Sequence, residues 1–492
     1  MSKTDQTAAA AILAVVMLCF STAAAGRSVA VKISVHGSEA RVEGRFLGVS
    51  GIRNLTFVDD LAGVRGLAAR VRDAAARARD GRELELRRLL PGEYVAVEDI
   101  SEWSYSLDLS PQKSAAAAAH ASWLATDRGV LYLYDLLPRM PRSAGAVPGI
   151  VNLELPDAWS ALTESGAAGG SVRFEAPDDA VIFVGRDLRA ERLRAGRIDA
   201  FAATVGTFKF SDRELHDTVI EIYSQYEGLF GSAAGAGPFA VVVTGFPNAV
   251  PPGSWEADTR GRTLMIVSSD MPFKSQSIQR LHEQLRHELF HLWLPNGVTL
   301  TGAYDWFYEG FALYQSLKLA VSLNRIRFED MLDTLARAHG IDTLQTQRPS
   351  LADASRVRVA TSANTQVYAR GMLVAFLCDL AMLERSKGRS SSGDLVRAVF
   401  EKYRRPAASR DGTEAVLELM RSRPELTEIV DRYVTGRDEI GWDVQLRAAG
   451  LESARSDFGT TLRVVQKPSA RQKAVLDKLG YNSWRKLPVN PR

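Results

Sequence analysis

The sequence predicts a multidomain protein in which a β-rich N-terminal half precedes a mostly helical C-terminal half. The chain has 492 residues, more than one hydrophobic core supports, so two or three domains are expected. Short alternating apolar runs separated by Gly, Pro and Asp fill residues 28–148 and are typical of an antiparallel sandwich. From residue 211 onward, apolar residues mostly recur three and four positions apart, which is the pattern of amphipathic helices.

The segment 1–25 has the composition of a secretory signal peptide. Lys3 precedes an apolar stretch at 8–20, and Ala25 ends a run of small residues suited to cleavage. The stretch is short for a membrane span, but Asp5 is unusual in a signal and leaves an uncleaved N-terminal anchor as the alternative. We therefore expect a secreted or periplasmic protein.

Cysteine content and charge exclude several classes of protein. Signal removal would take Cys19 and leave Cys378 alone, so no disulfide could form within one mature chain. The formal net charge is +3 at pH 7, which gives no reason to expect an anionic partner. We expect no nucleic-acid partner and no membrane contact beyond an N-terminal anchor.

The β-rich domain is expected to span 26–205. Its clearest strand-like runs are 29–35 and 130–134. Residues 64–88 are rich in Ala and Arg at helical spacing and predict an inserted, solvated helix. The end of the domain is expected within 186–212.

The following domain, 206–452, opens with a capping-box pattern from Ser211 to Glu214 ahead of an apolar-periodic run. A central helix is expected over 277–294, and the polar segment 348–364 predicts a loop near the cleft. The other expected elements are strands at 239–244 and 264–267 and helices at 328–338, 365–383, 393–403, 413–420 and 425–433.

The motif His-Glu-Leu-Phe-His at 287–291 lies within the central apolar-periodic run. In a helix, His287 and His291 lie on one face, one turn apart, and can chelate a metal ion. Imidazole suits zinc, and a catalytic zinc site takes three protein ligands and one water. Glu288 then lies beside the metal, where a carboxylate can act as general base. We expect one Zn²⁺ per chain; the alternative is a helix surface that carries two unrelated histidines.

A third ligand must come from a second element. A second apolar-periodic run begins near Tyr304, after a loop, and carries Glu309 in its first turns among several aromatic residues. A carboxylate there could instead be an N-terminal residue favoured by the helix dipole. Because the aromatic residues disfavour solvation, we predict that Glu309 is the third metal ligand.

These motifs resemble those of the gluzincin metallopeptidases, in which the Glu of a W-x-x-E-G motif is the third zinc ligand. Trp306-Phe307-Tyr308-Glu309-Gly310 matches that motif. The segment 367–373, Val-Tyr-Ala-Arg-Gly-Met-Leu, is similar to the V-Y-x-K-G segment of aminopeptidase N-like enzymes. The resemblance implies a thermolysin-like α/β catalytic domain and makes Tyr368 the donor to the developing oxyanion. Arg370 stands where those enzymes have Lys and keeps the charge.

The longer run from Tyr368 to Leu380 resembles the glycyl aminopeptidase family most closely. Members of that family often carry a C-terminal PDZ domain, but the segment 453–492 is too short for one. It contains nine Lys and Arg against two Asp. We expect a solvated basic extension packed on the catalytic domain, and contact with an anionic surface is the alternative.

Glu256 is the candidate contact for the amino group of the substrate. Gly253-Ser254-Trp255-Glu256-Ala257 partly matches the G-x-M-E-N strand of aminopeptidase N-like enzymes, whose Glu grips that group. Ala257 departs from the motif, so an ordinary carboxylate on an edge strand is an equal alternative.

The sequence therefore predicts a secreted zinc metallopeptidase that hydrolyses peptide bonds in a peptide or protein substrate. An aminopeptidase is the first specific expectation. An endopeptidase acting on small peptides is the alternative within the class. A catalytically inactive pseudopeptidase, acting as a periplasmic binding or scaffold protein, is the alternative from another class.

Overall fold

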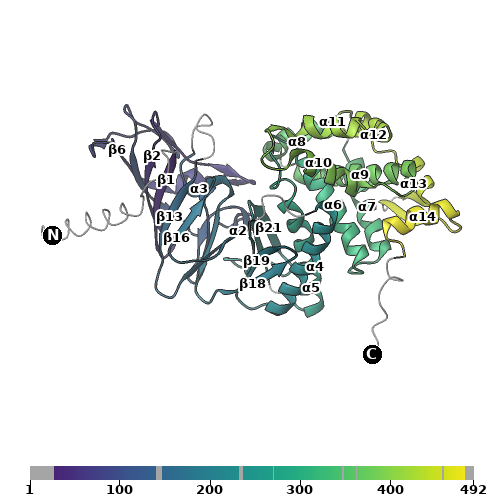
Figure 1. Cartoon of the computed structure of the whole chain (residues 1–492), viewed down its shortest axis with the longest axis horizontal. Coiled ribbons are helices and arrows are strands. Elements are labelled where there is room, and N and C mark those ends of the chain that lie inside the picture. Colours follow the sequence, from purple (N-terminus) through teal and green to yellow (C-terminus); the bar gives the residue numbers. More distant parts are fainter. Residues whose placement is uncertain are drawn as a thin grey trace.

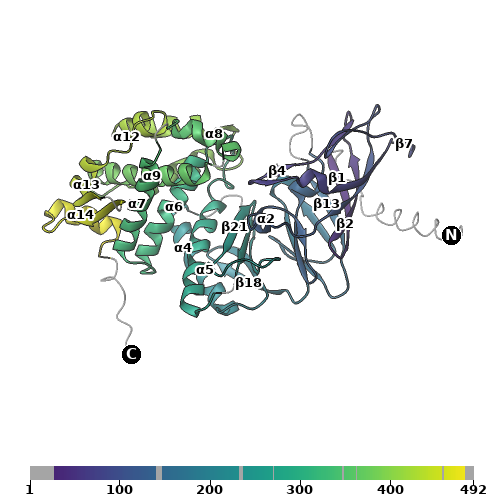
Figure 2. The same cartoon turned by 180° about the vertical axis from the view of Figure 1, so that it is seen from behind.

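The computed structural model describes residues 27–139, 147–231, 237–269, 271–345, 348–361, 363–456 and 459–482. The expected signal segment 1–25 lies outside these residues. A β-rich part, a central mixed sheet and a helical part follow one another along the long axis of the molecule (Figure 1). The C-terminal hairpin and α14 (Ala470–Leu479) lie at the end remote from the β-rich part (Figure 2).

Two sheets packed face to face form the β-rich domain and confirm the predicted sandwich. One has the order β16 (Ser171–Phe174), β13 (Gly149–Glu154), β1 (Ser28–His36), β2 (Glu39–Leu47), β10 (Glu102–Asp108), β6 (Val71–Arg77) and β7 (Glu83–Leu84). The other has the order β11 (Trp123–Leu124), β12 (Arg128–Tyr132), β17 (Val181–Gly185), β14 (Ser160–Thr163) and β15 (Gly166–Ala168). Buried side chains of both sheets share one core. Contrary to the antiparallel expectation, β1 pairs in parallel with β13.

Short elements complete this domain. They are the sheet of β3 (Asn54–Thr56), β9 (Glu93–Val95) and β8 (Arg87–Leu90), the hairpin of β4 (Asp60–Leu61) and β5 (Val64–Arg65), and the helices α2 (Ala117–His120) and α3 (Leu133–Leu136).

The helix predicted for 64–88 is wrong. Apart from a single 3₁₀ turn at Leu67–Arg70, the segment contains strands, and β6 pairs antiparallel with β10. Helix propensity is a weak local preference that tertiary pairing overrides, and small Ala side chains fit a strand between two neighbours. The buried Arg70 guanidinium lies 2.8 Å from Asp135, an ion pair that ties this segment to α3.

A five-stranded sheet is the centre of the molecule. Its order is β18 (Arg189–Ala195), β19 (Ile198–Val205), β20 (Phe239–Thr244), β22 (Thr263–Ser268) and β21 (Trp255–Arg260), with β19, β20 and β22 parallel and both outer strands antiparallel to their neighbours. This sheet crosses the boundary expected at residue 205, because β18 and β19 hydrogen-bond into it. The second domain therefore begins before β18, ahead of the expected limit.

Both faces of this sheet are buried, and successive side chains of β20 point to opposite faces. Val241 and Val243 join the core of the helical part, whereas Val242 packs with Val130 and Phe183 of the sandwich. The first face is covered by α4 (Asp212–Phe230), which begins with the predicted Ser211 capping box, and by α5 (Lys274–Glu288). The central sheet thus joins both domains.

The remaining helices form the rest of the helical part. They are α6 (Asp305–Ser322), α7 (Phe328–Thr343), α8 (Leu351–Thr361), α9 (Asn364–Ser386), α10 (Ser392–Tyr403), α11 (Gly412–Arg421), α12 (Pro424–Ile429) with a π-helical turn at Val430–Val434, and α13 (Asp443–Ala449). Among them, α6 packs on α5, and α9 packs on α6. A short parallel pair joins β23 (Leu300–Thr301) to β24 (Arg410–Asp411). The loop expected over 348–364 is therefore wrong: Ser350 accepts a hydrogen bond from the Asp353 amide and caps α8.

By length and composition α9 could span a membrane, contrary to the expectation that no stretch beyond the N-terminus would. In the structure 83% of its most apolar window is buried inside the protein, so other helices cover it. Cys378 on this helix is buried and free within the described part of the chain.

The segment after residue 450 is folded on the helical domain. β25 (Leu451–Ser456) and β26 (Gly459–Val464) form a hairpin, and α14 follows it. Leu451, Leu462 and Leu476 lie in the same core as α7 and α9. The expected limit at 452 therefore divides the first strand of this hairpin.

Candidate active site

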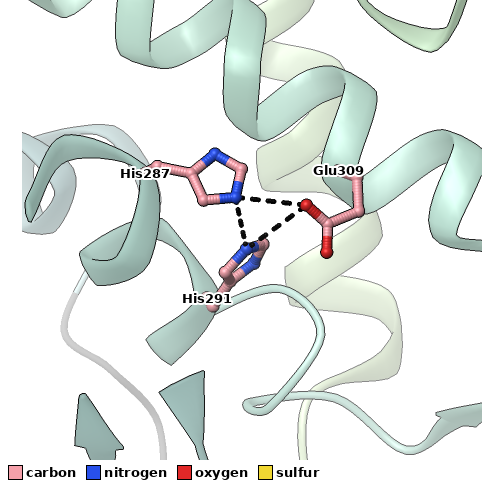
Figure 3. A group of neighbouring side chains, drawn as sticks. All are labelled: His287, His291 and Glu309. Carbon is pink, nitrogen blue, oxygen red and sulfur yellow. Dashed lines mark hydrogen bonds and ion pairs between the residues drawn. The ribbon is translucent and has the colours of Figure 1, made fainter. Parts of the chain in front are cut away.

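Three side chains from two helices meet at one point (Figure 3). His287 lies in the last turn of α5, and His291 lies in the 3₁₀ turn Leu289–Leu292 that continues it, so the α-helix ends earlier than the predicted residue 294. Glu309 projects from the second turn of α6. The two Nε2 atoms are 3.1 Å apart, and Glu309 Oε2 lies 3.1 Å from His287 Nε2 and 3.7 Å from His291 Nε2.

Hydrogen bonding fixes the tautomer of His291. Its Nδ1 lies 2.9 Å from the Leu294 carbonyl oxygen, which can only accept, so Nδ1 carries the proton. This hydrogen bond directs Nε2 toward His287 and Glu309, so that the ring offers the lone pair of Nε2 there whenever it is neutral. An imidazole nitrogen held in this way is arranged as a metal ligand.

The spacing of the three atoms fits a zinc ion. Ligand atoms about 2.0–2.2 Å from a tetrahedral zinc lie roughly 3.3–3.6 Å from one another. The observed separations of 3.1, 3.1 and 3.7 Å bracket that range. Two imidazoles and one carboxylate are also a donor set typical of catalytic zinc. The residues present therefore fit the metal that the sequence predicts.

The electrostatics of the cluster favour a charged Glu309. Burial by itself raises the pKa of this carboxyl, but His291 and His287 outweigh burial and bring the pKa down to about 2. Burial likewise lowers the pKa of His287, and Glu309 more than offsets it, so the pKa of His287 is raised. The cluster is a buried site at which opposite charges stabilise each other.

Glu288 lies beside the cluster and points at β21. Its Oε2 accepts a 2.6 Å hydrogen bond from the Thr259 hydroxyl, which is 3.1 Å from the Glu288 carbonyl oxygen as well. Burial raises the pKa of Glu288, against the charges of both histidines. A carboxylate that is buried, oriented and raised in pKa is suited to exchange a proton.

Close packing of α6 on α9 brings Glu309 and Tyr368 to the same place. A Cβ atom on Gly310 would lie 2.4 Å from the carbonyl carbon of Gly371, and one on Gly371 would lie 2.3 Å from the Trp306 carbonyl oxygen. The helices therefore cross with their backbones in contact, which only glycine permits. Each glycine follows a site residue closely in sequence, so the crossing point is also the point where the site is assembled.

Tyr368 is half-buried on α9 and lies within electrostatic range of Glu309 and Glu288. Burial is the main cause that raises its pKa, and the Glu309 charge adds to it. The phenol therefore keeps its proton and remains a hydrogen-bond donor.

Glu256 lies on β21, but the structure does not bring it into the metal cluster. Side chains alternate along a strand, so Glu256 shares a face with Asp258 and Arg260, opposite to the face of Thr259 that meets Glu288. Asp258 lies 3.6 Å from His120 and 2.9 Å from Arg260. Burial raises the pKa of Glu256. Its role as an amine contact stays a prediction.

The structure adds residues that the motifs did not indicate. Thr259 orients Glu288 through a hydrogen bond. The alternation of side chains along the strand could have predicted that Thr259 lies on the face of β21 opposite to Glu256. Asp258 lies within electrostatic range of Glu288, although the motif did not mark it as a site residue. Arg358 on α8 pairs with Asp305 at the start of α6, and no local pattern signals this contact.

No family model matches the sequence, and no curated protein matches it. Solved structures do match. An aminopeptidase N family protein from Idiomarina loihiensis superimposes with a TM-score of 0.72 at 14% identity, over 90% of this chain and 82% of that one. The M1 zinc metallopeptidase from Deinococcus radiodurans superimposes with a TM-score of 0.53 at 15% identity, over 84% of this chain and 96% of that one. The structure of a mutant M1 zinc metallopeptidase from the same organism, bound to a Tyr-Ser-Ala substrate, superimposes with a TM-score of 0.54 at 16% identity, over 85% of this chain and 96% of that one.

These identities are low, so the likeness concerns the fold. It extends over both the sandwich and the helical domain, and it agrees with the gluzincin architecture implied by the motifs. The chain has the fold of the aminopeptidase N-like M1 zinc metallopeptidases.

Proposed function

We propose that this protein is a zinc-dependent metallopeptidase with aminopeptidase-like specificity. The observation that carries the proposal is the convergence of His287, His291 and Glu309 beside a buried Glu288. The donor set, the tautomer of His291 and the spacing all fit one zinc ion per chain. The M1 zinc metallopeptidases that share this fold support the assignment.

The three ligands would hold the metal, which when bound supplies Lewis-acid catalysis by polarising a carbonyl group and acidifying water. The Thr259 hydroxyl occupies Oε2 of Glu288, so we assign proton exchange to Oε1. Glu288 accepts a proton from the attacking water there and returns it to the leaving amine. Burial raises the pKa of Glu288, which strengthens the carboxylate as a proton acceptor.

Tyr368 would donate its hydroxyl hydrogen to the oxygen of the scissile carbonyl as negative charge develops. Such a donor contributes about 3–4 kcal/mol when it is aimed at the transition state. Its pKa, raised by burial and by Glu309, keeps that proton in place throughout the working pH range. The pair of Glu288 and Tyr368 has no purpose in a binding protein, which favours an enzyme over a pseudopeptidase.

We further propose a peptide with a free amino terminus as substrate. A mutant M1 zinc metallopeptidase from Deinococcus radiodurans, similar in fold, was solved with a Tyr-Ser-Ala substrate, and a mutant two-domain M1 zinc metallopeptidase was solved with L-tryptophan. In this chain Glu256 on β21 is the carboxylate that we propose as the contact for a free amine, because Asp258 on the same face already pairs with His120 and Arg260. An endopeptidase, which needs no amine contact, is the alternative.

The test is hydrolysis of aminoacyl fluorogenic amides, with chelator, with zinc restored, and with the same peptides N-acetylated. We expect chelator-sensitive turnover of the free amines and one zinc per chain. Equal cleavage of acetylated peptides would establish an endopeptidase, and bound zinc without turnover would establish a pseudopeptidase. Glu288→Gln is expected to keep zinc and lose turnover, whereas Glu283→Gln, an exposed residue on the same helix, is the matched control.

We also propose that the protein is exported by its N-terminal segment. Lys3 and the apolar stretch at 8–20 support this. Fusion of residues 1–30 to a reporter that is active only outside the cytoplasm tests it. Export with loss of the segment indicates a cleaved signal, export with retention indicates an anchor, and no export contradicts the proposal.

A further inference from the structure

Arg358 lies between the two helices that carry Glu309 and Tyr368, and it contacts the first turn of each. Its Nε donates to Asp305 Oδ2, and its Nη1 donates to Asn364 Oδ1 at 2.9 Å. Asp305 is the first residue of α6, four residues before Glu309. Asn364 is the first residue of α9, four residues before Tyr368. One guanidinium therefore joins equivalent positions, one turn upstream of each site residue.

The Asp305 end of this bridge is rigid. Its carboxylate is buried, and it also accepts hydrogen bonds from the Ser355 and Tyr308 hydroxyls, each at 3.0 Å. The Tyr308 ring in turn meets the His291 ring edge to face, with centroids 5.9 Å apart. The first turn of α6 is thus fixed to α8 on one side and to the metal cluster on the other.

The Tyr368 end of the bridge contacts the aromatic ring directly. Arg358 Cζ lies 5.7 Å from the centroid of the Tyr368 ring, within the range of a cation–π contact. The guanidinium side chain is only 19% exposed, so solvent screens the contact weakly. Arg358 restrains the ring as well as the start of the helix that carries it.

The bridge lies at one end of the contact between α6 and α9. Gly310 and Gly371 let the two backbones approach closely. Beyond this crossing, Asp379 of α9 accepts hydrogen bonds from Tyr314 and Lys318 of α6, each at 2.7 Å. Arg358 adds a restraint on the other side of the crossing, one turn upstream of Glu309 and Tyr368.

We propose that Arg358 is a positioning residue that sets the orientation of Tyr368 relative to Glu309 and the metal. The inference rests on the proposed peptidase function for its effect on turnover. It also has a structural consequence that exists without turnover, because the environment of Tyr368 depends on the bridge whether or not a substrate is converted.

The activity test compares Arg358→Met with Arg356→Met. Arg356 lies on the same helix, is 56% exposed and pairs only with Asp353 among the described residues. We expect Arg358→Met to lower kcat about 10- to 100-fold, with KM within about 3-fold and zinc content unchanged. Arg356→Met should match the parent. A rise in KM at constant kcat would overturn the proposal, because it would make Arg358 a substrate contact.

A double-mutant cycle separates positioning from a general structural role. If Arg358 acts through Tyr368, then Arg358→Met should lower kcat by less than about 3-fold when it is introduced into the Tyr368→Phe variant. The same loss in both backgrounds would overturn the proposal. Arg358→Lys keeps the charge but replaces the planar fork of donors with a single nitrogen, so it should stay impaired; full activity would show that the charge suffices and would refute the need for a two-ended bridge.

A spectroscopic measurement tests the positioning without activity. We would place 3-fluorotyrosine at position 368 and record its ¹⁹F resonance in the metal-free and zinc-loaded protein. Arg358→Met should shift or broaden that resonance in both states, and Arg356→Met should not. Asn364→Ala removes only the α9 contact of an exposed residue, so it should shift the resonance without unfolding. An unchanged resonance in both Arg358→Met and Asn364→Ala would overturn the proposal. A shifted resonance in these variants, in a protein that shows no turnover, would refute only the peptidase function.

Discussion

The substitution Gly371→Ala tests whether backbone contact between α6 and α9 assembles the site. The added Cβ would lie 2.3 Å from the Trp306 carbonyl oxygen, and ordinary contacts begin at 3.4 Å. The helices must therefore separate by about 1 Å, which displaces Tyr368 relative to Glu309. A displacement of about 1 Å at a catalytic group can cost about 100-fold in rate, or roughly 2.7 kcal/mol.

The effect on stability should be smaller than the effect on activity. Overpacking costs about 1–3 kcal/mol, whereas replacing Gly by Ala inside a helix returns about 1 kcal/mol. We expect the free energy of unfolding to fall by between about 0 and 2 kcal/mol. Steady-state kinetics and urea unfolding of the same preparations measure both quantities.

Gly340→Ala is the matched control. Gly340 is also within a helix, α7, but no other atom lies within 4 Å of a Cβ built there. The Gly340→Ala variant should have a free energy of unfolding about 0.5–1 kcal/mol higher than the parent and should keep full activity. If Gly371→Ala keeps kcat within about 3-fold of the parent, the glycine crossing does not set the geometry of the site, and that reasoning fails.

Three further predictions follow from contacts elsewhere. Thr259→Val removes the hydroxyl that binds Glu288; kcat should fall about 10-fold with zinc content unchanged, and a loss of zinc would contradict an orienting role. Arg370→Met leaves the buried Asp342 without its closest cation, so the urea midpoint should drop by an equivalent of about 3 kcal/mol, and an unchanged midpoint would speak against the pair. Glu214, in the α4 capping box, has its pKa lowered to about 2 by the Ser211 amide and then Lys274; its stabilisation is therefore present above its ordinary pKa near 4.5 and lost as pH falls toward 2. Thermal unfolding at pH 6 and pH 3 should show a smaller pH dependence in Glu214→Gln, and an equal dependence would contradict this.

Much of the candidate site could be predicted because its ligands are close in sequence. His287 and His291 are four residues apart, and a single turn of helix brings their nitrogens together. That holds even though the turn is partly 3₁₀. The motif around Glu309 also identified the second helix correctly, and the sandwich was evident from alternating strands.

Other features depend on contacts between segments far apart in the chain. The Ala-rich segment at 64–88 became strands because β10 was available to pair with it. The expected boundary at residue 205 failed because hydrogen bonding to β20 decides which sheet β19 joins. Periodicity within one segment contains no information about its partner.

The side chains of the candidate site could be chosen from the sequence alone. They are two imidazoles, two carboxylates and a phenol, the kinds of group that the proposed zinc-dependent hydrolysis needs, and local spacing already orders His287, Glu288 and His291. Only the tertiary structure decided how these groups are held. Thr259 reaches Glu288 from β21, Gly310 meets Gly371 across two helices, and Arg358 joins the start of α6 to the start of α9. Residue type and helical period are local properties of the chain, whereas a hydrogen bond or a backbone contact between distant segments exists only once the fold has brought them together.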